Sequence, residues 1–409
     1  MEVMRNILKK APERPKPSAL NWVVYIGMFA LSLTIFYALA LRGGSDLSIH
    51  ATWAAEGNFL QPRTFLRHGA HPLWHGLVAA VMLVGIPVKW AAALVTAVLK
   101  VAELWLIRRL ISFFLQGKMK ESTITWAAVC CAMVMSLCVP WINPTVYYGI
   151  GSPNTWHSPT QLIAMVMMLL CVPYAAHCYA EFERLAPLHG AQTLLPWKKA
   201  AALGSLLFLS LLAKPTFMQA FLPAAGIFLL AQWWRHPQNS RFFGQIILAV
   251  LPAVLFMVVQ YMYYFGIIVP SQGSMALEVS LQKVLQTLVA TLLIQAFPLY
   301  VLLTCTKPRD FKSPLLSLTL LLDAVGVLEF LLLGETGRRA ADGNFGWGMM
   351  GGALMLWIVA MILFLRSFTA ARQAGKGKLR HAGGFALLGW HLASGLFYIV
   401  YLLAVPANL

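Results

Sequence analysis

The chain has 409 residues, of which 59% are hydrophobic and only 11% are charged, and its 31 Lys and Arg against 14 Asp and Glu give a formal net charge of +17. Soluble domains carry about 25% charged residues and do not expose so much apolar surface, so a soluble globular protein is excluded. A strongly basic chain also suggests nucleic acid as a partner. We exclude that class because the basic residues lie in short clusters between long apolar runs.

Membrane-spanning helices are predicted along most of the chain, because the hydrocarbon core is about 30 Å thick and a helix needs about 20 apolar residues to cross it. Such runs occupy residues 20–41, 122–140, 158–180, 200–213, 217–234, 244–265, 284–304, 314–333, 347–365 and 384–404. A further stretch, 73–107, is too long for one straight crossing and is interrupted at Pro87-Val88-Lys89. It is either two crossings or one crossing preceded by a half-inserted helix.

The distribution of basic residues decides between these alternatives, because cytoplasmic loops are enriched in Lys and Arg. If 73–107 crosses once, 22 of the 31 basic residues lie inside and 7 outside, whereas a double crossing moves 17 of them outside. We therefore predict an all-α, polytopic bundle of about 11 (10–13) spans, with 1–409 as one membrane domain and 1–19 as a basic cytoplasmic tail. The C-terminus is then outside, and the main outer loops are 42–72, 141–157, 266–283 and 334–346.

The first outer loop contains Ser45-Asp46, a typical helix start. We expect a helix here that lies along the membrane surface. Asp46 is either the cap of this helix or a general base that faces water. His50 and His71 are candidate sugar- or acceptor-binding residues. No metal site is expected, because these histidines lack a carboxylate at ligand spacing and the chain has no DxD or HExxH motif.

The second outer segment, 141–157, combines prolines, glycines and aromatic residues with no charged residue. Irregular backbone at membrane depth is stable only when it is buried in protein or lines a cavity. Aromatic rings beside Asn and His offer the flat apolar faces and hydrogen-bond groups that a sugar requires. The candidates for sugar or acceptor contacts are Tyr148, Asn154, Trp156 and His157. An aromatic belt at the membrane interface is the alternative.

Three basic residues on the outer side are candidates for binding a phosphate. Lys214 separates two apolar runs and has no acidic neighbour in the sequence, so it either snorkels to the interface or contacts an anion. Arg338 and Arg339 lie in a glycine-rich loop, and arginine binds phosphate through two parallel hydrogen bonds. The alternative for this pair is local ion pairing with Glu335 and Asp342.

Further acidic and amide side chains lie in or near this last loop. Glu335 and Asn344 are candidate sugar- or acceptor-binding residues. Asp323 and Glu329 lie within the run 314–333, where a buried carboxylate is costly and suggests a function. We expect Lys214 to be their partner.

Together these features resemble the GT-C superfamily of integral-membrane glycosyltransferases. A cytoplasmic N-terminus is followed by an outer acidic residue, in Ser45-Asp46-Leu-Ser-Ile-His50, then by a surface helix and about ten further crossings. Uncharacterised membrane proteins of bacterial surface-polysaccharide loci are similar in three short motifs, which here are Tyr148-Gly-Ile-Gly-Ser-Pro-Asn154-Thr-Trp156-His157-Ser-Pro-Thr160, Lys214-Pro-Thr-Phe217, and Glu335-Thr-Gly-Arg338-Arg339 with Gly343-Asn344-Phe345-Gly-Trp347.

The resemblance implies a sugar donor carried on a polyprenyl phosphate and a glycan or lipid-linked acceptor at the outer face of the bacterial plasma (inner) membrane. It also implies an inverting reaction in which Asp46, at the position of the superfamily's general base, takes the acceptor proton. Some members use a metal and paired acidic motifs. This chain lacks such a pair, so a metal-independent enzyme without a cofactor is expected, with the lipid bilayer as a partner and nucleic acid excluded.

Two other functions stay open. A polymerase or ligase of lipid-linked glycans also has many spans, but it usually carries one large outer loop, and the largest here, 42–72, is modest. A transporter or flippase often has inverted repeats and helices broken at the midplane. No repeat relates the two halves of this chain, and its polar residues cluster at one predicted face. No sequence feature indicates the sugar, the prenol or the oligomeric state.

Overall fold

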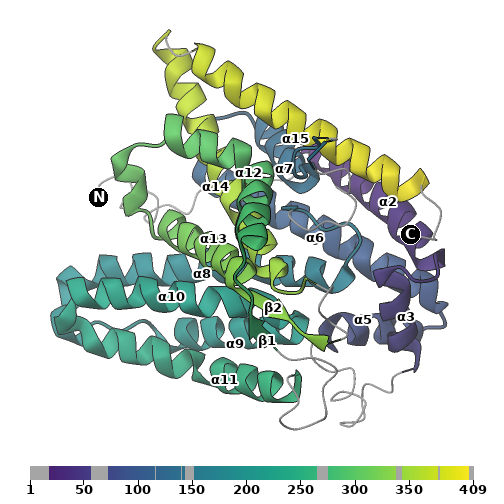
Figure 1. The fold of residues 1–409 in the computed structure, drawn as a ribbon. Coiled ribbons are helices and arrows are strands. Elements are labelled where there is room, and N and C mark those ends of the chain that lie inside the picture. Colours follow the sequence, from purple (N-terminus) through teal and green to yellow (C-terminus); the bar gives the residue numbers. More distant parts are fainter. Residues whose placement is uncertain are drawn as a thin grey trace.

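Long α-helices make up most of the structure, as the apolar runs predict (Figure 1). The computed structural model describes residues 18–56, 72–115, 117–139, 141–142, 152–264, 275–337, 343–375 and 378–404. The helices are α2 (Ala19–Leu41), α3 (Asp46–Glu56), α5 (Pro72–Met82), α6 (Val88–Leu115), α7 (Glu121–Met133), α8 (Pro159–His189), α9 (Trp197–Ala213), α10 (Pro215–Arg235), α11 (Ser240–Tyr264), α12 (Leu281–Thr304), α13 (Pro314–Leu332), α14 (Gly346–Gln373) and α15 (Lys378–Ala404), and the strands are β1 (Met275–Leu277) and β2 (Leu333–Glu335).

Nine helices in the described ranges are long and apolar enough to cross a membrane, namely α2, α6, α8 and α10 to α15. The prediction of an all-α protein rich in membrane-spanning helices is therefore confirmed. The predicted crossings 122–140 and 200–213 correspond to α7 and α9, which have 13 and 17 residues. At 1.5 Å per residue these two helices are about 20 Å and 26 Å long, short of the hydrocarbon thickness. The figure of 11 spans stays a prediction.

The ambiguous stretch 73–107 forms a short helix and a long helix. α5 has 11 residues and α6 has 28, with a turn between them at 83–87. The indole Nε1 of Trp74 donates to Thr96 Oγ1 at 3.2 Å, so α5 folds back against α6. A helix of 11 residues is only about 16 Å long, which fits one crossing preceded by a half-inserted helix better than two crossings.

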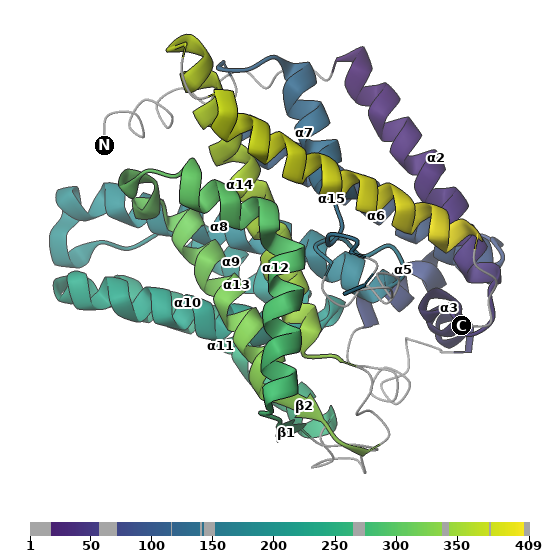
Figure 2. The ribbon, with the colours of Figure 1, turned by 45° about the horizontal axis from the view of Figure 1, so that its top comes forward.

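Residues 134–139 leave the helical path, so the predicted crossing 122–140 is helical only to Met133. Their backbone N–H groups need other partners, because unpaired polar groups are costly away from water. The amide of Leu137 donates to the Leu293 carbonyl of α12 at 2.9 Å, and the amide of Cys138 donates to Ser394 Oγ of α15 at 2.9 Å. α12 and α15 thus stabilise the irregular segment, and α15 crosses the front of the bundle in Figure 2.

α14 is the most buried helix, with every residue from Gly348 to Leu365 buried. It lies closest to α13 where glycines leave room for the two backbones. A Cβ on Gly352 would lie 2.6 Å from Asp323 Cα, and one on Gly326 would lie 2.7 Å from the Gly348 carbonyl carbon. Small residues allow helices to approach closely in membranes, so these glycines fix the distance between α13 and α14.

Gly352→Ala is expected to destabilise the protein by about 1–3 kcal/mol, because the added methyl group overpacks the contact with α13. Gly226→Ala on α10 is the matched control, since nothing lies within 4 Å of the Cβ it would add. Thermal unfolding of the two purified variants in detergent measures the difference. Equal midpoints would contradict the close-packing interpretation.

Connecting segments make contacts that join parts of the chain predicted on the same side of the membrane. On the predicted inner side, Arg366 Nη2 lies 3.3 Å from Asp310 Oδ1. On the predicted outer side, Arg42 donates to the Leu403 carbonyl at 2.9 Å. β1 and β2 also pair there in antiparallel register and join two predicted outer loops. This strand pairing was not expected from the sequence. Which end of the bundle faces the cytoplasm stays a prediction.

Candidate functional site

The helix expected after the first crossing is present as α3, and Asp46 is its first residue. The hydroxyl of Ser45 accepts a hydrogen bond from the Ser48 amide at 3.0 Å and so caps this helix. The Asp46 carboxylate instead contacts His50 one turn later, with 3.3 Å between Oδ1 and Nε2, and the Asp46 side chain is 38% exposed. Because Ser45 makes the capping bond, the carboxylate of Asp46 is available for another role.

Three neighbours stabilise the charged form of Asp46. Burial by itself raises the pKa of a carboxyl group, but here His50, the charge of Lys214 and the Ser158 hydroxyl outweigh it and hold the pKa of Asp46 below its usual range. Ser158 precedes α8 and is 1% exposed. Its hydroxyl lies close enough to affect Asp46, but it forms no hydrogen bond of ordinary geometry with any of the described residues. Asp46 is therefore a carboxylate at physiological pH.

Asp46, His50, Ser158 and Lys214 form a cluster, and His157 also faces this cluster from the segment before α8. Its Nδ1 lies 2.8 Å from the Tyr398 hydroxyl of α15, and its ring centre lies 6.0 Å from that of Trp347. Burial lowers the pKa of His157 and Lys214 lowers it further, while Asp46 raises it, with a net lowering. The imidazole is therefore neutral at pH 7. The mutual effects also place Asp46, His157 and Lys214 within electrostatic reach of one another.

Lys214 occupies the break between α9 and α10 and is 8% exposed. Its Nζ lies 4.0 Å from the centre of the Trp347 ring, which is a cation–π contact. Trp347 Nε1 donates to Asn344 Oδ1 at 3.2 Å, and Asn344 Nδ2 donates to Glu335 Oε2 at 2.7 Å. Trp347 therefore connects three of the residues that the sequence singled out, namely Lys214, Asn344 and Glu335.

Four helices begin at this cluster, namely α3, α8, α10 and α14. Gln161 Nε2 donates to the Trp347 carbonyl at 3.2 Å, and Thr216 Oγ1 donates to Gln161 Oε1 at 3.4 Å, so the starts of α8, α10 and α14 are in contact. The start of a helix carries partial positive charge and N–H groups that lack intrahelical partners. Their convergence beside Lys214 favours an anionic ligand.

A second imidazole extends the contact between Asp46 and His50 into the core. His50 Nδ1 lies 3.0 Å from Nε2 of His75 on α5. His50 is 6% exposed and His75 is fully buried. These three side chains thus form a line from the accessible carboxylate to the interior, and the second histidine of this line was not among the predicted site residues.

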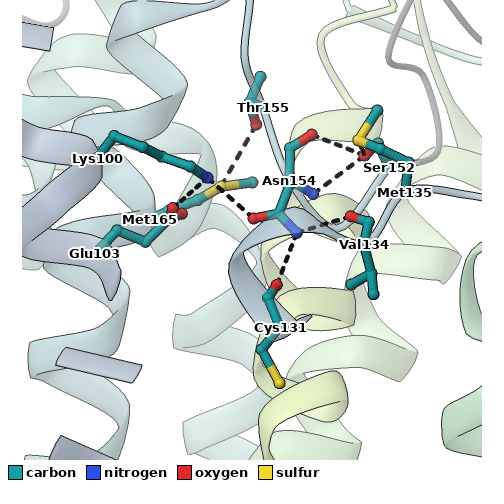
Figure 3. A network of polar contacts seen from close by, with 9 residues as sticks. All are labelled: Lys100, Glu103, Cys131, Val134, Met135, Ser152, Asn154, Thr155 and Met165. Carbon is teal, nitrogen blue, oxygen red and sulfur yellow. Dashed lines mark hydrogen bonds and ion pairs between the residues drawn. The ribbon is translucent and has the colours of Figure 1, made fainter. Parts of the chain in front are cut away.

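Asn154 and Trp156 are both fully buried and contact Lys100 of α6, and Figure 3 shows the contacts of Asn154. Asn154 Nδ2 donates to the carbonyls of Cys131 and Val134, each at 2.8 Å, and Asn154 Oδ1 accepts from Lys100 Nζ at 3.2 Å. Trp156 is fully buried, with Lys100 Nζ 4.5 Å from its ring centre. Both side chains hold their segment against α6 and α7. We therefore leave them out of the sugar-binding set that the sequence suggested.

The same network contains a buried ion pair. Lys100 and Glu103 lie one turn apart on α6, pair with each other and are both fully buried (Figure 3). A buried charge is tolerated only when it is paired and hydrogen-bonded. Lys100 meets this condition through Glu103, Asn154 and the Trp156 ring.

Other predicted residues lie elsewhere. Asp323 accepts a hydrogen bond from Gln295 Nε2 of α12 at 2.6 Å. The expected pairing of Asp323 and Glu329 with Lys214 stays a prediction. Within the described ranges, no group of three or more His, Cys, Asp and Glu side chains is arranged to hold a metal ion. Four predicted site residues lie outside the residues that the structure describes, namely His71, Tyr148, Arg338 and Arg339.

Four residues of the cluster were not predicted from the sequence, namely His75, Ser158, Trp347 and Tyr398. Ser158 and Trp347 stand next to or near predicted candidates, and His75 ends the histidine-rich stretch of the first outer loop. Their closeness to predicted candidates in the sequence was a signal that could have identified these three residues. Tyr398 lies inside the apolar run 384–404, where nothing distinguishes a functional tyrosine from a packing residue.

No model of a known protein family matches the chain, and no curated protein matches it significantly.

Proposed function

We propose that the protein is an integral-membrane glycosyltransferase, which moves a sugar from a polyprenyl-phosphate donor to an acceptor hydroxyl at the outer face of the bacterial plasma membrane. The observation that carries the proposal is an ionised, accessible carboxylate within reach of a buried lysine where four helices begin. Transfer from a phosphate needs both groups, a base for the acceptor hydroxyl and positive charge for the leaving group.

In the proposed reaction, Asp46 takes the proton of the acceptor hydroxyl while the acceptor oxygen bonds to the anomeric carbon. The bond from this carbon to the phosphate oxygen of the donor breaks, and its electron pair leaves with the phosphate. Attack and departure occur on opposite faces of the sugar, so the configuration inverts. Ser158 and His157 are the proposed hydrogen-bond partners of the sugar or the acceptor, because both lie beside Asp46.

The leaving phosphate is proposed to bind at Lys214 and the starts of α8, α10 and α14. Negative charge builds up on the phosphate as its bond to the sugar breaks, so fixed positive charge stabilises the transition state more than the ground state. The chain from Glu335 through Asn344 to Trp347 orients the indole beneath Lys214. Arg338 and Arg339 remain candidates for the same phosphate from the sequence alone.

A cavity between α8, α9, α10 and α11 supports a lipid-linked donor. Its volume is about 260 Å³, and its lining is mainly apolar, with Leu207, Phe221 and Phe228 among the residues. Leu207 and Phe221 each lie seven residues from Lys214 on α9 and α10, which is about 10 Å along either helix. Since a cavity of about 150 Å³ holds a benzene molecule, this one has room for about ten carbon atoms. A segment of the prenyl chain that begins about 10 Å from the phosphate is the proposed occupant.

The proposal is tested with purified protein in liposomes that contain a panel of undecaprenyl-phosphate-linked hexoses and a lipid extract as the acceptor source. Release of undecaprenyl phosphate is measured. Wild type is expected to consume at least one donor, and Lys214→Met is expected to lower the rate about 10²-fold through loss of charge at the leaving group. Lys283→Met, which removes a predicted outer lysine paired with the exposed Glu278, is the control and should stay within about twofold.

Two outcomes contradict the proposal. One is that wild type cleaves no donor of the panel. The other is movement of the labelled lipid across the bilayer without bond cleavage, which would favour a flippase.

A further inference from the structure

Basic side chains gather at the end of the bundle opposite the candidate site. α14 is long and apolar enough to cross a membrane and starts beside Trp347 in the site. Arg366 lies 19 positions further along this helix, which is about 29 Å and close to the thickness of the hydrocarbon core. In Figure 2 the end of α14 and the start of α15 accordingly lie away from β1 and β2. We therefore expect this end at the other surface of the membrane.

An ion pair and two hydrogen bonds hold this end of the bundle together. Arg366 Nη2 lies 3.3 Å from Asp310 Oδ1, and the backbone amide of Lys307 donates to Asp310 Oδ2 at 2.9 Å. Arg380 Nη1 donates to the Thr304 carbonyl at 3.1 Å. The ends of α12 and α14, the segment after α12 and the start of α15 are thus neighbours.

The positive charge at this end exceeds what the chain itself neutralises. Asp310 is the one acidic residue in the ranges 300–314 and 366–380. A single carboxylate balances one positive charge, whereas five described basic side chains meet there. They define the basic patch, namely Lys307, Arg309, Lys312, Arg366 and Arg380. The basic patch therefore attracts an anion from outside the chain.

Arg380 is already oriented for such an anion. Its guanidinium donates to the Thr304 carbonyl and, at 3.4 Å, to Ser367 Oγ, and both of these acceptors are neutral. The two bonds hold the group in place and leave three of its five N–H groups for a ligand. Arg380 is also exposed. A guanidinium that is held in this way binds phosphate with a smaller loss of conformational entropy.

Exposed apolar side chains stand among these charges. Phe311 lies between Arg309 and Lys312 in the sequence, and Leu379 precedes Arg380. Phe311 is about half exposed, and Leu379 is almost fully exposed. A soluble phosphate gains nothing from such neighbours, whereas a phospholipid offers both a phosphate and acyl chains. The combination of charge and apolar surface favours a lipid.

We propose that the basic patch binds an anionic phospholipid, with its phosphate among the lysines and arginines and its acyl chains against the exposed apolar residues. Cytoplasmic leaflets are rich in anionic lipids, and basic groups between membrane helices bind their head groups. This matches the predicted inner side of the segments 307–312 and 366–380. The binding site does not depend on the proposed glycosyl transfer. A bound lipid links the ends of α12, α14 and α15.

Native mass spectrometry of the full-length, delipidated protein in detergent tests the proposal, with phosphatidylglycerol as the probe and phosphatidylcholine as the zwitterionic comparison. Wild type is expected to bind phosphatidylglycerol at least about 10-fold more tightly than phosphatidylcholine, because only the former has a net negative charge. Arg309→Gln/Lys312→Gln is expected to weaken phosphatidylglycerol binding about 30-fold, since each basic residue near anionic lipid contributes about fivefold. Both side chains are exposed, so this variant should fold.

The matched control is Lys198→Gln/Arg235→Gln, which removes one exposed lysine and one exposed arginine from other segments of the predicted inner side. Its affinity for phosphatidylglycerol should stay within about twofold of wild type. Three results would overturn the proposal. Wild type shows no preference for phosphatidylglycerol, Arg309→Gln/Lys312→Gln binds it as wild type does, or millimolar glycerol 3-phosphate displaces it. The last result would show that the basic patch recognises a soluble phosphate and not a lipid.

Discussion

Asp46→Asn is expected to lower the rate of sugar transfer by about 10²–10⁴-fold, the usual contribution of a positioned general base. Asparagine has nearly the same size and still accepts a hydrogen bond from His50, but its amide does not take a proton. The helix should stay intact, because Ser45 and not Asp46 makes the capping bond of α3. The initial rate of undecaprenyl phosphate release at equal amounts of reconstituted protein measures the effect.

The control for Asp46→Asn is Glu278→Gln, which neutralises another carboxylate on the predicted outer side. Glu278 is 56% exposed in its side chain and pairs with Lys283. Its rate should stay within about twofold of wild type, because exposed ion pairs contribute little. If Asp46→Asn keeps the full rate at normal expression, Asp46 is not the base.

Lys100→Met is expected to destabilise the protein by about 3–5 kcal/mol, the usual cost of removing one partner from a buried ion pair. Glu103 is fully buried and would be left as an unpaired charge, and Asn154 Oδ1 would lose its lysine donor. The midpoint of thermal unfolding in detergent, followed by size-exclusion analysis of heated samples, measures the loss. Lys89→Met, which changes an exposed lysine at the start of the same helix, is the control.

The double variant Lys100→Met/Glu103→Leu separates the cost of an unpaired charge from the cost of altered packing. Replacing both members of a buried ion pair with apolar residues is often neutral or stabilising. The double variant is therefore expected to unfold at a higher temperature than Lys100→Met, with a strongly non-additive coupling between the two sites. Additive losses, or a Lys100→Met midpoint equal to that of wild type, would show that the pair contributes nothing to stability.

Hydropathy and charge predicted the all-α fold well, because a helix that crosses hydrocarbon must be long and apolar whatever it packs against. The end of α7 was not predictable in this way. Residues 134–139 are as apolar as the helix before them, and their departure from it depends on hydrogen bonds from α12 and α15. Such partners are distant in sequence and leave no mark on local composition.

The charged residues of the candidate site could be predicted from the sequence. The neutral residues were harder to predict, because their role depends on the direction in which the folded chain points each side chain. Asp46 and Lys214 stand out because charged residues are rare in this chain, and the structure brings them within electrostatic reach. Asn154 and His157 lie three residues apart in an irregular segment, yet one is buried against α7 and the other faces the cluster. No helical or strand period applies to such a segment, so the direction of each side chain depends on tertiary contacts.

The hydrogen bonds that join Cys138 and His157 to α15 also determine when, during synthesis of the chain, the candidate site can form. Cys138 bonds to Ser394 and His157 bonds to Tyr398, more than 240 positions further along the chain in each case. Synthesis proceeds from the N-terminus, so α3, α8 and α10 exist long before α15. A nascent chain that already carries Asp46 and Lys214 still lacks the partner that orients His157. The proposed reaction centre is therefore completed only when α15 has packed against the segments that contain Cys138 and His157.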